Sequence, residues 1–195
     1  MKRFFAAALA VVLAACSTNT ELTITPEGIG PVKIGMNIAD LPQSVEGLYD
    51  SVEVVVTEGY YDEFEGEDVP SSETYYFVLG GENVFNVTPY EGVIDAITVT
   101  GASFSYAGVH PGMSCRDALA TEATLSAMGC FASCEFYACF LNGEAPIHIL
   151  FDYDSFSEEG YAKLYDMPFY EGWYELNFEP SDFNEDATIR EIVIM

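Results

Sequence analysis

The sequence predicts an α+β fold of two tandem repeats, each a short helical element followed by an antiparallel β-meander. Segments of the first half return in the second half in the same order, and the segments after each predicted helix are rich in β-branched and aromatic residues, which favour strands. The matching pairs are Gly30–Pro42 with Ala107–Leu119, Tyr75–Glu82 with Tyr137–Glu144, and Val93–Val99 with Thr188–Ile194. We therefore expect repeat 1 over residues 22–101 and repeat 2 over residues 102–195.

A helix is predicted near the start of each repeat. Asn37 and Ser114 are favourable N-cap residues, and an aspartate follows each of them three residues later, which approximates a capping box. We expect a short helix after Asn37 that ends near Pro42. In the second repeat we expect a longer helix from Cys115 to about Met128.

The meanders are predicted from strand-forming segments and turn residues. Gly80-Gly81 and Asn142-Gly143 stand where tight hairpin turns belong. The expected strands of the first repeat are Tyr75–Leu79, Val84–Val87 and Val93–Val99.

The start of each repeat also resembles a known bacterial repeat. Gly35-Met36-Asn37 and Gly112-Met113-Ser114 are each followed by an aspartate and then by a predicted sheet. This pattern is similar to that of the β-lactamase-inhibitor-protein fold and of small outer-membrane assembly lipoproteins. The resemblance implies tandem copies of a helix plus a four-stranded sheet. It covers only the motif, so no inhibitory-loop residue is carried over.

The first residues are typical of a secretion signal. Lys2 and Arg3 precede the apolar run Phe4–Leu13, which is about half of the roughly 20 residues that a membrane-spanning helix needs. A short apolar run with a basic flank and small residues at its end indicates a cleaved signal peptide. We assign it to residues 1–15.

Leu13-Ala14-Ala15-Cys16 resembles the lipobox of bacterial lipoproteins. The resemblance implies cleavage before Cys16, which then carries a diacylglycerol and acyl chains such as palmitate. Two or three acyl chains give stable membrane attachment, and residues 16–21 form a lipidated tether. Ser17 is not the aspartate that favours inner-membrane retention. We therefore expect a lipid-anchored protein of a bacterial cell envelope, at the outer membrane, facing the periplasm or the cell surface.

The composition is strongly acidic, with 32 Asp and Glu against six Lys and Arg and a formal net charge of −26. Such a surface repels nucleic acid and favours cationic partners or metal ions, so we predict no nucleic-acid partner. With half of its residues apolar, the chain is not a disordered acidic tail.

Four cysteines remain once Cys16 is assigned to lipid, and in an oxidising compartment they predict two disulfides. They are Cys115, Cys130, Cys134 and Cys139. Their spacing does not provide the paired C-x-x-C of a zinc site, so we predict no metal centre.

The repeat favours one pairing of these cysteines. If Cys134 and Cys139 lie in one extended segment, they are about 16 Å apart at ~3.3 Å per residue, too far for a disulfide. Cys115 aligns with Ile38 and Cys139 with Phe77, which we expect to pack together in the first repeat. We therefore predict Cys115–Cys139 and Cys130–Cys134, with Cys115–Cys134 as the pairing that would contradict this.

Two regions are candidates for partner binding. The acidic run Tyr60–Asp68 falls where the first repeat is longer, and we expect it to be a surface loop. Its candidate residues are Asp62, Glu63, Phe64 and Glu65. Neither this run nor Asp152–Gly160 has the spacing of an EF-hand calcium loop. Trp173, in an aromatic segment, is a candidate to stack on a glycan or contact a protein.

No catalytic constellation emerges from the sequence. His110 and His148 are the two histidines, and no Gly-x-Ser-x-Gly stretch accompanies them. No cofactor motif is present either, so we predict no cofactor. We expect a non-enzymatic binding module with a protein or glycan partner. The alternatives are an inhibitor of a basic hydrolase, and a glycan-binding or carbohydrate-active protein.

Overall fold

The computed structural model describes residues 23–62, 64, 66–121, 125–132, 135–142, 146–165, 172–176 and 178–195. Within these ranges it leaves out the side chains of residues 44, 125–132, 135–142, 153, 164–165 and 172–176. The predicted signal peptide, Cys16 and the tether lie outside the described residues.

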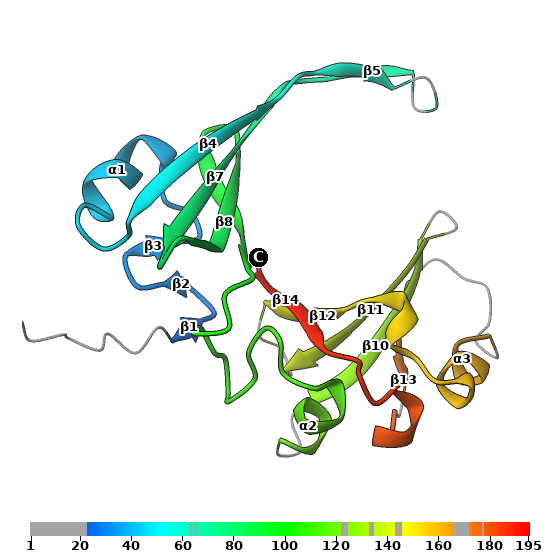
Figure 1. Ribbon diagram of the computed structural model, residues 1–195. Helices are drawn as coiled ribbons and strands as arrows, with labels where there is room; N and C mark the ends of the chain where they lie inside the picture. Colours follow the sequence, from blue (N-terminus) through cyan, green and yellow to red (C-terminus); the bar gives the residue numbers. More distant parts are fainter. Residues whose placement is uncertain are drawn as a thin grey trace, which may run out of the picture.

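The described chain is built around one antiparallel sheet of nine strands. From one edge to the other the strands are β13 (Gly172–Leu176), β10 (Leu125–Ala132), β11 (Glu135–Asn142), β12 (Ile147–Phe151), β14 (Ile189–Ile194), β9 (Val93–Val99), β8 (Glu82–Tyr90), β7 (Ser72–Leu79) and β4 (Ser51–Thr57). Strand β14 pairs with both β12 and β9 (Figure 1). It therefore joins two parts of the sheet, which are β13, β10, β11 and β12 on one side and β9, β8, β7 and β4 on the other. Antiparallel sheet with a few short helices is the overall class, which confirms the mixed helix-and-strand prediction in its coarse form.

The smaller elements are short. A three-stranded sheet contains β1 (Ile24–Thr25), β2 (Gly28–Ile29) and β3 (Val32–Lys33), and a separate hairpin contains β5 (Tyr60–Asp62) and β6 (Glu67–Val69). The α-helices are α1 (Leu41–Ser44), α2 (Cys115–Ala120) and α3 (Glu158–Tyr165). The 3-10 turns are η1 (Ile38–Asp40), η2 (Tyr153–Ser155) and η3 (Pro180–Asp182).

The predicted helix from Cys115 to Met128 is wrong beyond its first turns. Helix α2 ends at Ala120, and Thr121 takes an extended conformation with its hydroxyl donating to the Ala118 carbonyl at 2.6 Å. Residues 125–132 then form β10, which pairs with β11 and β13 on its two sides. A short apolar run is compatible with either a buried strand or a helix. Here the hydrogen-bonded pairing of β10 with β11 and with β13 stabilises the strand.

The helix start after Asn37 is confirmed, but its end is not. The Asn37 side chain accepts the Ala39 N–H at 2.9 Å, as a cap should. Pro42 lies in the first turn of α1 rather than at its end, where its missing N–H is not needed. Ser114 occupies the cap position of α2, but its side chain makes no capping hydrogen bond.

The three strands expected in the first half are confirmed by β7, β8 and β9. Gly80 and Gly81 form the predicted two-residue turn, since Leu79 pairs with Glu82 and both glycines have positive φ, at 65° and 82°. Positive φ at both central residues is what a type I′ hairpin turn requires.

The core contains two aromatic clusters, one at each part of the sheet. In the first, Phe77 and Phe85 stack with ring centroids 4.1 Å apart, and Tyr49 meets both rings edge-on. In the second, Phe156 and Phe183 stack at 5.3 Å, and Phe151 meets both edge-on. Buried residues of the central strands β9 and β14 connect the clusters into one core.

Candidate binding edge and pocket

Strand β4 is the outermost strand of the sheet on one side, and all seven of its residues are exposed. Its sequence, SVEVVVT, is rich in valine and contains neither lysine nor proline, the residues that commonly protect a sheet edge. Among the described residues β4 pairs only with β7. The N–H and C=O groups on its outer side are therefore available to another extended chain.

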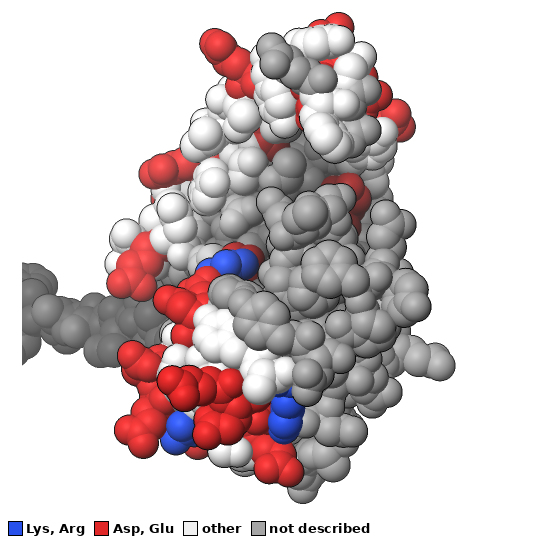
Figure 2. Space-filling model, turned by 90° about the vertical axis from the view of Figure 1, so that its right-hand side faces the viewer, with Lys and Arg blue, Asp and Glu red and all other residues white. Residues whose placement is uncertain are grey.

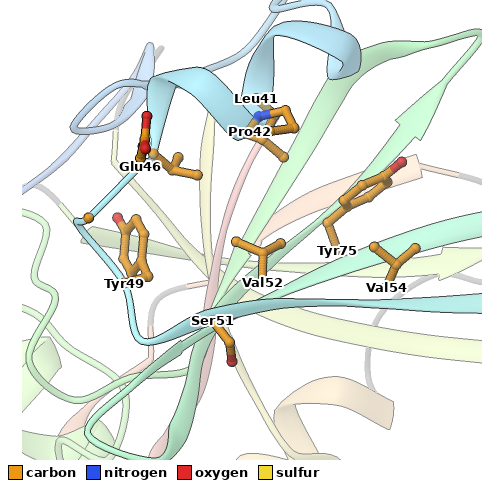
Figure 3. Close-up of a pocket in the computed structure, with 10 residues that line it drawn as sticks. Leu41, Pro42, Glu46, Tyr49, Ser51, Val52, Val54 and Tyr75 are labelled. Carbon is orange, nitrogen blue, oxygen red and sulfur yellow. The ribbon is translucent and has the colours of Figure 1, made fainter.

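A pocket of about 360 Å³ lies beside this strand, beneath α1 (Figure 3). Val52, Val54 and Tyr75 form its floor on the sheet, while Leu41 and Pro42 approach from α1. Ser51 points to the other side of β4 in the same view. The pocket is thus apolar and lies on the same face of β4 as alternate valines.

The polar groups of the pocket do not form a catalytic arrangement. Burial raises the pKa of the Tyr49 phenol to about 12, so this group stays neutral at ordinary pH. Glu46 is exposed at the rim, and the Tyr75 hydroxyl donates to Glu73 at 2.7 Å. The geometry suits an apolar side chain that enters beneath α1.

The acidic run that was expected to be a surface loop is a hairpin of β5 and β6, which we call the arm. It extends the β4–β7 ribbon well beyond the body of the molecule (Figure 1). Asp62 accepts the Phe64 N–H at 2.8 Å through its carboxylate and the Gly66 N–H at 2.8 Å through its carbonyl. The loop prediction missed this pairing because it rested on the acidic residues of the run and gave no weight to the strand-forming Tyr60, Tyr61 and Val69 on either side of them.

The arm presents exposed aromatic residues between its acids. Phe64 at its tip is 93% exposed, and Tyr60 and Tyr61 are 60% and 59% exposed. Of the predicted binding residues, Asp62 and Phe64 therefore lie together at the tip. Glu63 and Glu65 lie outside the described residues, and so does the side chain of Trp173, whose backbone pairs with Cys130 in the ladder of β13 and β10.

Charge is unevenly distributed along the chain. No lysine or arginine occurs between Lys33 and Arg116, and that stretch contains fourteen acidic residues. Acidic side chains outnumber basic ones on the described part of the face in Figure 2. In the second half, Lys163 and Arg190 are already paired with carboxylates, at 2.5 Å from Asp182 and 2.8 Å from Asp152.

The predicted Cys115–Cys139 disulfide is not formed in the structure, where Cys115 is a free and fully buried thiol. In the ladder Cys139 pairs with Leu150, whereas Phe140 pairs with the fully buried Ile149. The backbone position opposite the buried Ile149 is therefore that of Phe140 and not that of Cys139. Cys134 and the side chain of Cys130 lie outside the described residues, so their bridge stays a prediction.

The histidines lie apart from the pocket. His148 is in β12, where burial lowers its pKa, and His110 Nδ1 is 2.8 Å from the Pro111 carbonyl oxygen. Within the described ranges, no three His, Cys, Asp or Glu side chains are grouped so as to hold a metal ion. In the same ranges, no helix has the length and apolar character to cross a membrane.

Comparison with known proteins gives a distant structural likeness. No protein-family model matches the chain, and no curated protein matches it either. The fold is similar to the crystal structure of the uncharacterized protein yfeY from Escherichia coli, with a TM-score of 0.48 and 12% sequence identity. The alignment covers 88% of this chain and 98% of that one. A likeness of this degree assigns no function.

Proposed function

We propose that this protein is a lipid-anchored lipoprotein of a bacterial cell envelope that acts as a non-enzymatic binding module. Its partner docks on β4 and the neighbouring pocket. The observation that supports this most is a valine-rich strand at the sheet edge, all of whose residues are exposed, next to an apolar pocket. Strand addition at such an edge takes affinity from main-chain hydrogen bonds and specificity from pockets for alternate side chains.

Anchoring through Cys16 rests on the lipobox that directly follows a signal-like run. Metabolic labelling with palmitate in a bacterial host, followed by membrane fractionation, tests it. We expect a labelled, membrane-bound protein, and an unlabelled protein when Cys16→Ser is introduced. Equal labelling of the two chains would rule out Cys16 as the acylated residue.

Site-specific photo-crosslinking tests the binding edge. A benzophenone amino acid at Val55 or at Val56, both on β4, is irradiated in native membranes, and the same amino acid at exposed Asp186 is the control. We expect one common adduct from the two β4 positions and none from the control. An adduct of equal yield at all three positions would show that β4 is not a preferred contact.

We also propose that the two halves are tandem copies, and matching hydrogen bonds support it. The Gly35 N–H donates to the Ile94 carbonyl at 2.7 Å, and the Gly112 N–H donates to the Ile189 carbonyl at 2.8 Å. Gly35 and Gly112 share a φ of 81°. Each glycine opens a Gly-Met-Asn/Ser motif, so the motif docks on the same position of β9 and of β14.

Matching irregularities in the sheet support the same proposal. The β8–β9 ladder shifts register between Thr88 and Pro89, and the β12–β14 ladder shifts between Leu150 and Phe151. If these positions correspond, Cys139, opposite Leu150, corresponds to Thr74, opposite Thr88.

The sequence match between Tyr75–Glu82 and Tyr137–Glu144 aligns Cys139 with Phe77, whereas the ladders align Cys139 with Thr74. The two alignments therefore differ by three residues. An odd offset exchanges the two faces of a strand. Phe77 and Cys139 therefore do not occupy equivalent positions, which explains why the disulfide inferred from their alignment is not formed.

A second function, inhibition of a basic hydrolase, is favoured by the arm, which presents an almost fully exposed Phe64 among carboxylates. A lysozyme activity assay with increasing amounts of this protein tests it. Inhibition that falls with added salt and is lost in Phe64→Ala would support it. Full lysozyme activity at an excess of this protein would exclude that enzyme as the target.

A further inference from the structure

Resting on the proposed function of the β4 edge, we infer that the partner contributes a cationic, extended polypeptide segment. This segment adds a strand to β4, places an apolar side chain in the pocket, and carries lysine or arginine on its other face, which it shares with Glu53. Three features lead to this conclusion: the faces of β4, the charges around it, and the net charge of the whole chain.

The two faces of β4 dictate alternation in the added strand. Val52 and Val54 face the pocket, so Val56, two residues further on, belongs to the same row. An added strand continues both faces of the sheet, because its side chains alternate with the same period of two. Every second residue of the partner segment therefore extends the valine row, and one of these side chains enters the pocket beneath α1.

The charged residues on β4, just after it and at the neighbouring pocket are acidic among the described residues. Glu53 on the strand and Glu58 just after it are exposed, as is Glu46 at the rim of the pocket. Glu73 lies directly opposite Val56 in the β7 ladder. The nearest lysine and arginine in the sequence are Lys33 and Arg116. Glu53 lies on the face of β4 opposite the valine row, whereas Glu46 and Glu73 lie on the valine side and add to the local negative potential. The partner residues that alternate with the apolar ones share the face of Glu53, so they should be lysine or arginine.

A second copy of this chain fits the edge less well. Two chains of formal charge −26 repel each other, and pairing β4 with β4 would bring together two surfaces that lack any basic residue from 34 to 115. A cationic segment from another protein meets the opposite condition, since each lysine reduces the local excess of negative charge. The experiment below separates these two occupants.

Three synthetic probes of ten residues test the inference. The first alternates valine and lysine. The second alternates proline and lysine, which keeps the charge, removes the N–H of every second residue and holds φ at about −65°, away from the values of a flat antiparallel strand. The third alternates valine and glutamate, which keeps the strand pattern but reverses the charge. Binding to the full chain is measured by fluorescence anisotropy at 0.05 and 0.3 M NaCl, together with deuterium uptake of residues 51–57.

We expect the valine–lysine probe to bind at least tenfold more tightly than either of the others. We also expect it to bind at least tenfold more weakly at the higher salt, and to slow deuterium uptake in β4. Equal binding of the proline–lysine probe would show that the acidic protein attracts any cationic peptide without strand pairing, and this would overturn the inference. Equal binding of the valine–glutamate probe would overturn it as well.

Variants with matched exposure locate the binding. Val52 on β4 and Val93 on β9 are each 37% exposed, but only β9 has a strand on both sides. Val52→Lys should weaken binding of the valine–lysine probe at least tenfold, and Val93→Lys should change the affinity for this probe by less than twofold. Glu53→Gln, a nearly isosteric change at an exposed position, should weaken binding of this probe two- to fivefold. Equal effects of the two lysine substitutions would place the binding elsewhere.

Two further readouts separate the inference from the proposed function. If sedimentation shows a dimer that Val52→Lys dissolves, the occupant is a second copy and the inference is wrong. If the crosslinks from Val55 and Val56 form while the three probes bind alike, β4 binds a partner of another chemistry. If the crosslinks themselves are absent, the proposed binding edge fails.

Discussion

Tyr49 is the residue that connects the core to the candidate pocket. Its ring packs edge-on against both Phe77 and Phe85, and the residue also lines the pocket beneath α1. Burial disfavours the phenolate, which raises the pKa of Tyr49 from 10.0 to about 12. A ligand in the pocket therefore meets a neutral hydroxyl at any physiological pH.

The raised pKa of Tyr49 predicts a loss of stability at alkaline pH. The unfolded chain ionises this phenol near pH 10 and the folded chain only near pH 12. The contribution of Tyr49 is thus complete below pH 10 and is lost as the pH rises toward 12. Urea unfolding at pH 8, 10 and 11 should show that the stability advantage of the wild type over Tyr49→Phe shrinks with pH. An advantage independent of pH would show that Tyr49 is not protected from ionisation by the fold.

Cys115 provides a second test at the scale of one residue. Burial, reinforced by the negative charge of Asp152, raises the pKa of its thiol to about 12, and the thiolate is the reactive form. Iodoacetamide at pH 8 should leave Cys115 unmodified in the native protein and modify it in urea, as peptide mass mapping would show. Recovery of Cys115 in a disulfide with Cys139 would instead restore the pairing predicted from the sequence.

At the scale of elements, the sequence was informative where one segment decides its own structure. The Gly80-Gly81 turn and strands β7 to β9 follow from local turn chemistry and strand propensity. The prediction of a helix that reaches Met128 was wrong because residues 125–132 form a strand through pairing with β11 and β13, which are distant in the sequence or follow later in the chain. Pro42 was misplaced because proline suits a first turn as well as it ends a helix.

The candidate binding edge was missed for a related reason. The run Ser51–Thr57 is visibly rich in β-branched residues, and composition alone suggests a strand. Whether a strand is central or at an edge depends on the order of strands in the sheet, which the residues of that strand do not encode. The pocket adds a further dependence, because it forms only where α1 crosses β4.

The arm gives a prediction at this scale. Its described side chains are mostly exposed and none of them belongs to the core, so we expect the arm to contribute little to stability. Because Thr57 pairs with Ser72, replacing residues 58–71 with Asn-Gly should close β4 and β7 into a tight hairpin. We expect the free energy of unfolding to change by less than about 1 kcal/mol. Urea unfolding monitored by circular dichroism is the measurement, and loss of the folded state would show that the arm supports the sheet.

At the scale of the whole molecule, the central ladder between β14 and β9 unites two aromatic clusters in one core. Val99 pairs with Ile192 and Ile97 with Ile194, and all four side chains are fully buried. Both parts of the sheet depend on this contact, so we expect them to unfold together.

Truncation of Ile194 tests this coupling. Ile194→Ala should lower the free energy of unfolding by about 2–4 kcal/mol, as large-to-small changes in a core do. Near- and far-ultraviolet circular dichroism should still report one shared transition in urea. The neighbouring Met195→Ala, at an exposed site, should change stability by less than about 0.5 kcal/mol. Two separate transitions in the wild type would show that the halves fold independently.

The central place of β14 also matters while the chain is being made. A ribosome adds residues 189–194 after every residue of the strands that β14 joins. Until then β9 and β12 each have an unpaired edge and expose isoleucines that are buried in the folded protein. Such an edge favours aggregation. The nascent chain therefore cannot complete its sheet early, and a holding chaperone that covers these two strands would protect it until synthesis passes residue 194.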